Sequence, residues 1–305
     1  MIEADIAVVG GGIAALTAAA EAARRGRRVQ VFTGALPGGL LLSIEAVQGL
    51  PEHPDGIAGY DLCPMAQEAA MDAGAACIAD EAGAVQRDGG RWLVRGADAA
   101  LSAVNAINAV SARALILAPG SRLRALGVPG EERLAGKGVS HCASCDAPLL
   151  RGKTVAVVGG GDAACQEALT LAAHAARVHL LLRGEALRAR PAWQQRVQAQ
   201  PRIDLQPRTE VAEVLGDAAV GGLRLRDGRT LAVDAVFIYI GLQPATEWLA
   251  GAPATVALDS DGRIADDAAQ GLFAAGTARR GNDGQAATAI DEAVAAARAA
   301  DEFLA

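Results

Sequence analysis

Short apolar runs that end in glycine-rich turns, each followed by an alanine-rich stretch, recur along this chain. The first run, residues 6–9, leads into Gly10-Gly11-Gly12 and an alanine-rich segment to about Arg25. The second run, residues 154–158, leads into Gly159-Gly160-Gly161 and a similar segment to about Ala175. Apolar runs of this length, bounded by glycine and followed by helix-forming residues, predict a strand, a tight turn and a helix in both places.

Each predicted helix is followed by a second strand-like run, at residues 28–33 and 177–183. Both turns have the spacing G-x-G-x-x-A, with Ala15 and Ala164 at the last position. Within a strand–helix–strand unit this spacing is the dinucleotide fingerprint, because the glycines let the backbone approach a pyrophosphate at the helix N-terminus. Two copies therefore predict two nucleotide-binding domains.

Shorter strand patterns follow each fingerprint. Residues 85–94 and 223–233 contain Asp-Gly turns between apolar stretches and predict hairpins. Residues 114–118 and 236–240 read as buried strands that end in turns, so the second domain echoes the first. A final strand at 272–276 and an alanine-rich helix at 285–304 are expected to return to the first domain.

The expected fold is therefore α/β, with two Rossmann-like domains of three layers (ββα), the first of them discontinuous. The expected boundaries are residues 1–116 for the first part of the first domain, 117–242 for the second domain, and 243–305 for the remainder of the first. A length of 305 residues suits two domains.

Composition excludes some classes of partner. The chain is 51% hydrophobic and 21% charged with a net charge of −7, which indicates a globular protein without the basic blocks that bind nucleic acid. No run approaches the ~20 apolar residues of a membrane span, and the chain opens on a strand pattern instead of a leader. A cytoplasmic protein is expected, and its five cysteines are not expected to form a disulfide framework.

One close cysteine pair lies just before the second fingerprint, in the segment His141-Cys142-Ala143-Ser144-Cys145-Asp146. A C-x-x-C pair can close a small disulfide ring with one activated thiol. The alternatives are half of a zinc site, for which no second ligand pair exists, and a structural pair without chemistry. Asp146 can exchange a proton during thiol chemistry or cap a helix. The three remaining cysteines are expected to be small buried hydrophobes.

The order of these motifs resembles the low-molecular-weight thioredoxin reductases over essentially the whole chain. The most specific feature is the C-x-x-C inside the second nucleotide domain, followed by Gly241-Leu242-Gln243-Pro244-Ala245-Thr246 and a late Ala-Ala-Gly. In glutathione-reductase-like enzymes the redox pair follows the first fingerprint, but residues 36–50 contain no cysteine here.

The resemblance implies a homodimer with FAD in the first domain and two domains that swing. It implies that Cys145 faces the flavin, that Cys142 exchanges with the substrate, and that Asp146 is the acid–base group. The FAD residues it implies are Gly10, Gly12, Ala15, Thr33, Gly34, Gly38, Gly39, Leu40, Gly49, Gly276, Thr277, Gln285 and Ala286. The residues it implies for NADPH are Gly159, Gly161, Ala164, Arg183 and Arg188.

Several positions depart from the family pattern. Leu40 stands where the family has a glutamine, and Thr277 stands where it has an aspartate. The NADPH signature H-R-R-x-x-x-R reads Leu182-Arg183-Gly184-Glu185-Ala186-Leu187-Arg188, so one arginine is missing. Loss of one charge-assisted contact to the 2′-phosphate would weaken NADPH binding by roughly tenfold or more.

Three functions are consistent with these residues. The first, favoured by the eroded arginine set and the altered flavin surroundings, is an FAD-dependent dithiol oxidase that closes a disulfide in a small molecule and passes electrons to oxygen, as in gliotoxin, holomycin or romidepsin formation. The second is an NADPH-dependent reductase of thioredoxin or a thioredoxin-like protein. The third is a nucleotide-binding regulator in which the dithiol senses redox state.

Overall fold

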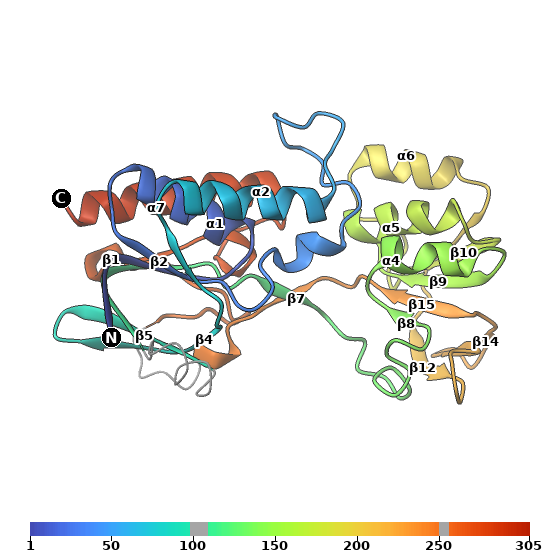
Figure 1. The fold of residues 1–305 in the computed structure, drawn as a ribbon. Helices are drawn as coiled ribbons and strands as arrows, with labels where there is room; N and C mark the ends of the chain where they lie inside the picture. The colour runs from blue at the N-terminus through green and yellow to red at the C-terminus, as the bar shows by residue number, and fades with distance from the viewer. Residues whose placement is uncertain (98–108, 250–255) are drawn as a thin grey trace. The chain divides into compact units, whose positions relative to one another are not determined.

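The computed structural model describes residues 1–97, 109–249 and 256–305 (Figure 1). The chain divides into two compact units: unit 1 is Met1–Arg122 with Gln243–Ala305, and unit 2 is Leu123–Leu242. Residues 117–122, which the sequence assigned to the second domain, thus belong to unit 1. The reason is that the strand ending at Leu117 pairs with Ala274 inside the sheet of unit 1.

Within the described residues, unit 1 contains a sheet of order β3-β2-β1-β6-β5-β4, with β17 paired to β6. Its strands are β1 (Ile2–Val9), β2 (Val29–Phe32), β3 (Ala76–Ile78), β4 (Ala82–Asp88), β5 (Arg91–Gly96), β6 (Val110–Leu117) and β17 (Leu272–Ala274). The pairs of β1 with β2 and β6 are parallel, and they place Val9 opposite Phe32 and Leu117. The carboxyl ends of these three strands therefore meet at one edge, where parallel sheets bind ligands.

Three helices of unit 1, two of them rich in alanine, pack together against one face of this sheet (Figure 1). They are α1 (Ile13–Arg24), α2 (Gly59–Asp72) and α7 (Ala286–Phe303). Ala18 and Ala22 of α1 and Ala293 and Ala297 of α7 are completely buried, because small side chains let the two helices approach closely. The C-terminal helix expected from the sequence returns to the first unit in this way.

The expected hairpin forms β4 and β5, joined by Gly89 and Gly90 with φ of +53° and +81°. Positive φ at both turn residues matches the twist of the two strands. Trp92 of β5 is completely buried and its indole N–H donates to the carbonyl of Gln270 at 2.9 Å. The hairpin thus closes a second core on the other face of the sheet.

Unit 2 repeats the plan with a parallel sheet of order β11-β10-β9-β15-β8. Its strands are β8 (Val139–Ser140), β9 (Thr154–Val158), β10 (Arg177–Leu181), β11 (Ile203–Gln206) and β15 (Ala235–Ile238). The helices α4 (Ala143–Asp146), α5 (Asp162–Ala172) and α6 (Pro191–Ala199) belong to this unit, and a small antiparallel sheet of β12 (Val211–Leu215), β13 (Gly222–Leu225) and β14 (Thr230–Leu231) completes it. Two separate apolar clusters make up its core, as expected for layers on both faces of the central sheet.

The remaining elements are short. They are β7 (Ser121–Leu123), which pairs with β16 (Leu242–Pro244), and the 3₁₀ helices η1 (Gly39–Ser43), η2 (Ala147–Leu150), η3 (Glu247–Leu249), η4 (Ala268–Gln270) and η5 (Gly276–Ala278). In the described ranges, none of the helices has the length and apolar character that a membrane crossing demands.

Candidate active site

The turn between β1 and α1 is built so that no side chain fits its first two positions. Gly10 has φ +125°, and a β-carbon there would lie 2.0 Å from the carbonyl oxygen of Ala118. A β-carbon at Gly11 would lie 2.0 Å from the carbonyl oxygen of Thr33. At Gly12, by contrast, no described atom lies within 4 Å of the β-carbon position. The turn therefore has an open side at the start of α1.

Gly12 is also the N-cap residue of α1, and no side chain of the described structure caps the helix there. The first backbone N–H groups of the helix are thus available to an external acceptor, and the helix dipole adds positive potential at this end. An open cradle beside uncapped N–H groups fits a pyrophosphate.

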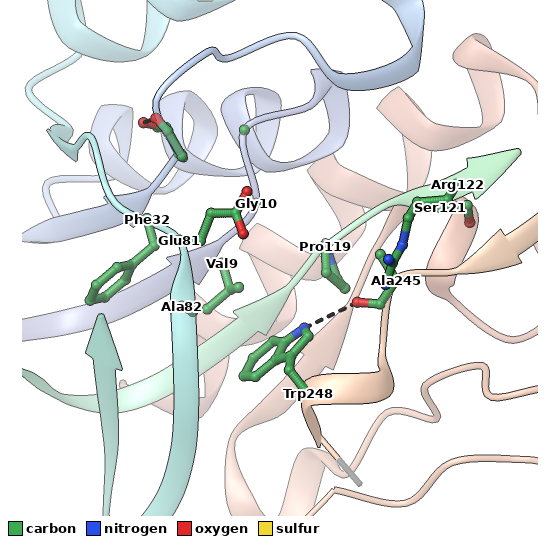
Figure 2. Close-up of a pocket in the computed structure, with 13 residues that line it drawn as sticks. Val9, Gly10, Phe32, Glu81, Ala82, Pro119, Ser121, Arg122, Ala245 and Trp248 are labelled. Atoms are coloured by element: carbon green, nitrogen blue, oxygen red, sulfur yellow. Dashed lines mark hydrogen bonds between the residues drawn. The ribbon is translucent and has the colours of Figure 1, made fainter. Parts of the chain in front are cut away.

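A pocket of about 360 Å³ extends from this turn over the carboxyl ends of β1 and β2 (Figure 2). Its lining residues come from unit 1 alone: Val9, Gly10, Gly11, Phe32, Thr33, Gly34, Glu81, Ala82, Pro119, Ser121, Arg122, Ala245 and Trp248. Three of the residues assigned to FAD from the sequence, Gly10, Thr33 and Gly34, belong to this lining. Thr33 is fixed in place, because its hydroxyl donates to the carbonyl oxygens of Gly34 and Ile78 at 3.0 and 3.1 Å.

Several lining residues were not identified from the sequence. Trp248 stands on one wall of the pocket, with its indole N–H bonded to the carbonyl of Ala245 at 3.0 Å (Figure 2). The hydroxyl oxygen of Ser121 is buried and has no hydrogen-bond partner among the described residues. A buried hydroxyl without a partner costs free energy, and one that lines a ligand pocket has a ligand atom as its natural acceptor. Neither residue lies in a recognisable motif, so no sequence signal marks them.

The segment after β2 adds a second edge to the glycine turn. The N–H of Gly38 donates to the carbonyl of Gly11 at 2.7 Å, and the β-carbon position of Gly39 lies 3.8 Å from the Cα of Gly12. Leu40 follows in η1, whereas Gly49 lies further on in an exposed turn with φ +82°. Gly38 and Gly39 thus lie beside the cradle, and Gly49 is not among the residues that line the pocket.

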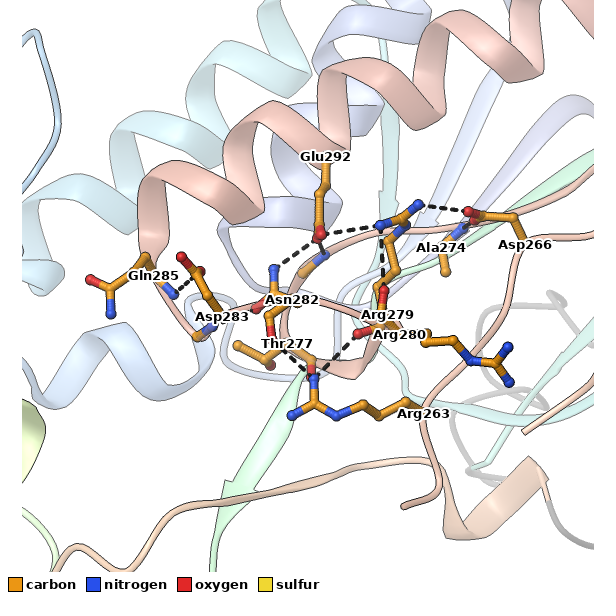
Figure 3. A network of polar contacts seen from close by, with 12 residues as sticks. Arg263, Asp266, Ala274, Thr277, Arg279, Arg280, Asn282, Asp283, Gln285 and Glu292 are labelled. Atoms are coloured by element: carbon orange, nitrogen blue, oxygen red, sulfur yellow. Dashed lines mark hydrogen bonds and ion pairs between the residues drawn. The ribbon is translucent and has the colours of Figure 1, made fainter. Parts of the chain in front are cut away.

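The loop after β17 is held against the first turn of α1 by a polar network (Figure 3). Gly276 has φ +75° and a β-carbon there would lie 2.9 Å from the β-carbon of Ala14. The carboxylate of Glu292 accepts the N–H of Gly276 at 2.9 Å and the side-chain amide of Asn282 at 2.8 Å. Arg279 bonds the other oxygen of Glu292 at 3.3 Å.

The same loop and the start of α7 hold three further residues that the sequence assigned to FAD. Thr277 follows Gly276 in η5, Gln285 is the N-cap of α7, and Ala286 is the first residue of that helix. Gly276 therefore lies beside the first turn of α1, and the residues that hold the loop there were not anticipated from the sequence. Glu292 lies 16 residues from Gly276 in sequence, and no motif links them.

In unit 2, Cys142 and Cys145 form a disulfide with a Cα–Cα distance of 5.3 Å. Cys142 is the N-cap of α4, and its sulfur accepts the N–H of Cys145 at 3.3 Å. The N–H of Asp146 bonds the carbonyl of Cys142 at 3.3 Å. The C-x-x-C segment thus forms one helical turn with the first sulfur at its start, and the carboxylate that the sequence singled out directly follows the second sulfur in the chain.

The side chain of Tyr239 holds the start of α4 through one hydrogen bond. Its hydroxyl oxygen accepts the N–H of Ala143, a completely buried residue, at 3.3 Å. Tyr239 is only 7% exposed, and burial, together with the charges of Glu167 and Asp146, raises the pKa of its phenol. The tyrosine therefore stays neutral over the physiological range and keeps the start of α4 in place.

The second glycine turn has the same construction as the first. Gly159 has φ +143°, and a β-carbon there would lie 2.2 Å from the carbonyl oxygen of Tyr239. Gly161 is the N-cap of α5, and Ala164 is completely buried against the turn. Arg183 and Arg188 are exposed beyond the end of β10.

The three other cysteines have no disulfide partner. Burial raises the pKa of the Cys63 and Cys77 thiols, and burial with the nearby charge of Asp162 raises that of Cys165 to about 11. A thiol with a raised pKa is a poor nucleophile near neutral pH. The reactive sulfur chemistry of the chain is thereby concentrated at Cys142 and Cys145.

Two glycine cradles on separate Rossmann-like units, with a disulfide at a helix start in the second unit, define a dinucleotide-dependent disulfide oxidoreductase. Residues 4–300 match the family model described as pyridine nucleotide-disulphide oxidoreductase, and the chain belongs to this family. It is 34% identical over 310 residues to the thioredoxin reductase of Treponema pallidum, covering 98% of this chain and 97% of the relative. It is 36% identical over 312 residues to that of Mycolicibacterium smegmatis, covering 99% and 96%.

Solved structures give the same result. The thioredoxin reductase of Lactococcus lactis, in a form called the FR conformation, has a TM-score of 0.89 at 27% identity and covers 99% of both chains. That of T. acidophilum also has a TM-score of 0.89, at 28% identity, with both chains fully covered. The expected two-domain α/β fold is thus confirmed, and the protein is an FAD-dependent oxidoreductase of the thioredoxin-reductase type.

The residues of unit 1 fit FAD. The Gly10–Gly12 turn and the first N–H groups of α1 suit the pyrophosphate, and the pocket beside Thr33 and Gly34 suits the adenosine end, because ribose groups bind at the end of the second strand of such a unit. FAD supplies a two-electron carrier between a nicotinamide and a disulfide.

Proposed function

We propose that this protein is an NADPH-dependent reductase of thioredoxin or of a thioredoxin-like protein, with Cys142–Cys145 as the exchanging disulfide. The observation that supports it best is the disulfide at the start of α4 within a chain that is 34–36% identical, over nearly its full length, to thioredoxin reductases. The dithiol-oxidase interpretation that the sequence favoured gains no support from these relatives, which are named as reductases.

In the reduced state, we assign the nucleophile to Cys142. Its sulfur accepts the N–H of Cys145 in the disulfide form, and the same N–H can stabilise a thiolate there. The Cys142 thiolate attacks the substrate disulfide and forms a mixed disulfide, and the departing substrate sulfur takes a proton from Asp146.

Cys145 completes the exchange. As a thiolate it attacks the sulfur of Cys142 in the mixed disulfide, reforms the internal disulfide and releases the second substrate thiol, which also takes up a proton. Two electrons leave the protein dithiol and the substrate gains two electrons and two protons. FAD and a nicotinamide, when bound, would supply the two electrons that return the disulfide to the dithiol.

An anaerobic titration tests the direction of electron flow. The FAD-loaded protein is mixed with stoichiometric NADPH, or separately with a small dithiol, and bleaching of the flavin absorbance is followed. We expect rapid bleaching by NADPH and transfer of electrons to oxidised thioredoxin. Bleaching by the dithiol alone, with hydrogen peroxide formed on admission of air, would refute the reductase and establish the oxidase.

Cysteine variants test the assigned roles. Cys145→Ser should trap a mixed disulfide between Cys142 and a substrate thioredoxin, visible as a covalent adduct by mass spectrometry, because no resolving thiol is left. Cys142→Ser should trap no such adduct. Cys77→Ser, at a cysteine outside the dithiol, serves as the control and should keep full turnover. An adduct on Cys145 in the Cys142→Ser variant would reverse the assignment.

The homodimer and the cytoplasmic location implied by the sequence stay predictions. Sedimentation of the FAD-loaded protein tests the first, and cell fractionation tests the second.

A further inference from the structure

Arg208 has an unusual backbone for its residue type. Its φ is +52°, and it is the single non-glycine residue with positive φ in the described part of the chain. Side chains with a β-carbon are strained in this conformation, where glycine and asparagine are preferred. An arginine held in such a conformation makes its side chain a candidate for a functional role.

Two hydrogen bonds fix Arg208 beside the end of β10. Its N–H donates to the carbonyl of Gly184 at 2.9 Å, and the N–H of Thr209 donates to the carbonyl of Leu182 at 2.7 Å. The β10 and β11 strands are parallel neighbours, so the turn after β11 lies next to the segment after β10. The backbone of Arg208 is therefore hydrogen-bonded to Gly184, the residue that stands where the NADPH signature has its missing arginine.

The space at that residue is open. No described atom lies within 4 Å of the β-carbon position of Gly184, so no neighbouring side chain fills it. On the other side, the N–H of Arg188 donates to the carbonyl of Gly160 at 2.7 Å. The glycine turn and the segments after β10 and β11 are thus joined at one edge of the sheet, and Arg183, Arg188 and Arg208 all belong to that edge.

The charges at this edge favour a doubly charged anion. Arg208 pairs with Glu185, but the two side chains are 73% and 75% exposed, so the pair is solvated and free to exchange partners. Arg183 and Arg188 have no ion-pair partner among the described residues. In a dinucleotide-binding unit, the end of the second strand is where the adenosine ribose lies, and arginine there accommodates a 2′-phosphate.

We propose that Arg208 replaces the arginine missing at position 184 and, with Arg183 and Arg188, binds the 2′-phosphate of NADPH. The selectivity for NADPH over NADH then comes from two segments of the chain and not from the continuous signature alone. This inference rests on the proposed reductase function for its coenzyme, but it concerns a binding site that can be measured without turnover.

The test compares two nucleotides that differ by one phosphate, adenosine 2′,5′-bisphosphate and AMP, by calorimetric titration of the FAD-loaded protein. We expect the wild type to bind the bisphosphate at least about tenfold more tightly. Arg208→Asn, which relaxes the backbone, should lower this preference about tenfold and leave AMP binding unchanged. Glu185→Gln should raise the preference, because it removes the competing carboxylate.

Arg224→Asn is the matched control, since Arg224 forms an exposed ion pair with Glu213 elsewhere in unit 2. It should leave both affinities unchanged. An unaltered preference in Arg208→Asn would overturn the proposal, as would a wild type that binds both nucleotides equally.

Steady-state kinetics distinguish a failure of this inference from a failure of the proposed function. With NADPH as donor, Arg208→Asn should raise KM about tenfold at nearly constant kcat, and with NADH neither constant should change. A wild type that prefers the bisphosphate but does not reduce thioredoxin would refute the reductase and leave the role of Arg208 standing.

Discussion

The substitution Tyr239→Phe removes one oxygen atom and tests whether the Tyr239 hydroxyl stabilises the start of α4, the helix that carries the disulfide. The hydroxyl of Tyr239 accepts the N–H of Ala143 at 3.3 Å, and Ala143 is completely buried. After the substitution this N–H has lost its acceptor in a site that water does not reach. An orphaned buried donor costs about 1–3 kcal/mol, so we expect the variant to be less stable by that amount near pH 8.

The pH dependence of the unfolding free energy provides a second test with a defined direction. The pKa of Tyr239 in the folded protein is raised above its usual value of about 10, mainly by burial. The folded state therefore holds the phenol proton after the unfolded state has released it, and wild-type stability falls as pH rises through 10. By pH 11 the loss reaches about 1.4 kcal/mol, of which about 0.4 kcal/mol is already present at pH 10, and the phenylalanine variant does not have it. The difference between the two proteins should shrink by that amount.

Urea unfolding of the FAD-loaded proteins at pH 8, 10 and 11, followed by circular dichroism, measures this difference. Tyr60→Phe is the control, because Tyr60 is 62% exposed, and it should follow the wild type at every pH. Equal stability of Tyr239→Phe and wild type at pH 8, or parallel curves up to pH 11, would refute the role given to the hydroxyl.

Four other substitutions or measurements follow from the structure. Gly10→Ala places a β-carbon 2.0 Å from the carbonyl oxygen of Ala118, at a residue with positive φ. The variant should therefore purify with little FAD, which its flavin absorbance per chain will show. Normal FAD loading would contradict the role given to the Gly10 turn. Trp248→Ala removes one wall of the pocket and should weaken the binding of FAD by about 1–2 kcal/mol, measured by fluorescence titration of the apoprotein. An unchanged affinity would mean that Trp248 packs only against protein. Cys165, with a pKa of about 11, should resist iodoacetamide at pH 8 while the reduced dithiol is alkylated, which peptide mass spectrometry will decide. Glu131→Gln replaces a buried carboxylate that accepts three backbone N–H groups at 2.9, 2.7 and 3.4 Å. It should cost about 1–3 kcal/mol in urea unfolding, and no loss would show that the amide serves equally well.

Local patterns were enough for the elements of the fold. The glycine turns at Gly10 and Gly159 stand between a strand and a helix in both units, as their spacing predicts. Asp-Gly turns predicted the β4–β5 and β13–β14 hairpins, and both form. Boundaries were less accurate: α5 ends at Ala172 instead of about Ala175, although the N–H of Ala175 still bonds the carbonyl of Leu171 at 2.8 Å. Apolar periodicity fixes the type of an element better than its last residue.

For the cysteine pair, the sequence predicted the local feature but not the distant residues around it. Its spacing of three residues predicts a disulfide, and the structure contains one. The groups around the pair could not be predicted, because Tyr239 lies 96 residues from the N–H it accepts. A single chain gives no signal for a hydrogen bond between segments that only the folded sheet brings together.

The sequence by itself thus determined what is local: two strand–turn–helix fingerprints, the C-x-x-C between them, and a C-terminal helix for the first unit. Tertiary structure decided which distant residues complete each site. Ser121 and Trp248 line the pocket because β7 and η3 lie near the end of β1, and Glu292 holds Gly276 because α7 packs on α1. Arg208 lies beside Gly184 because β10 and β11 are parallel neighbours. Glycine turns are dictated by the backbone of a few consecutive residues, whereas the walls and charges of a binding site depend on packing between residues that are remote in sequence.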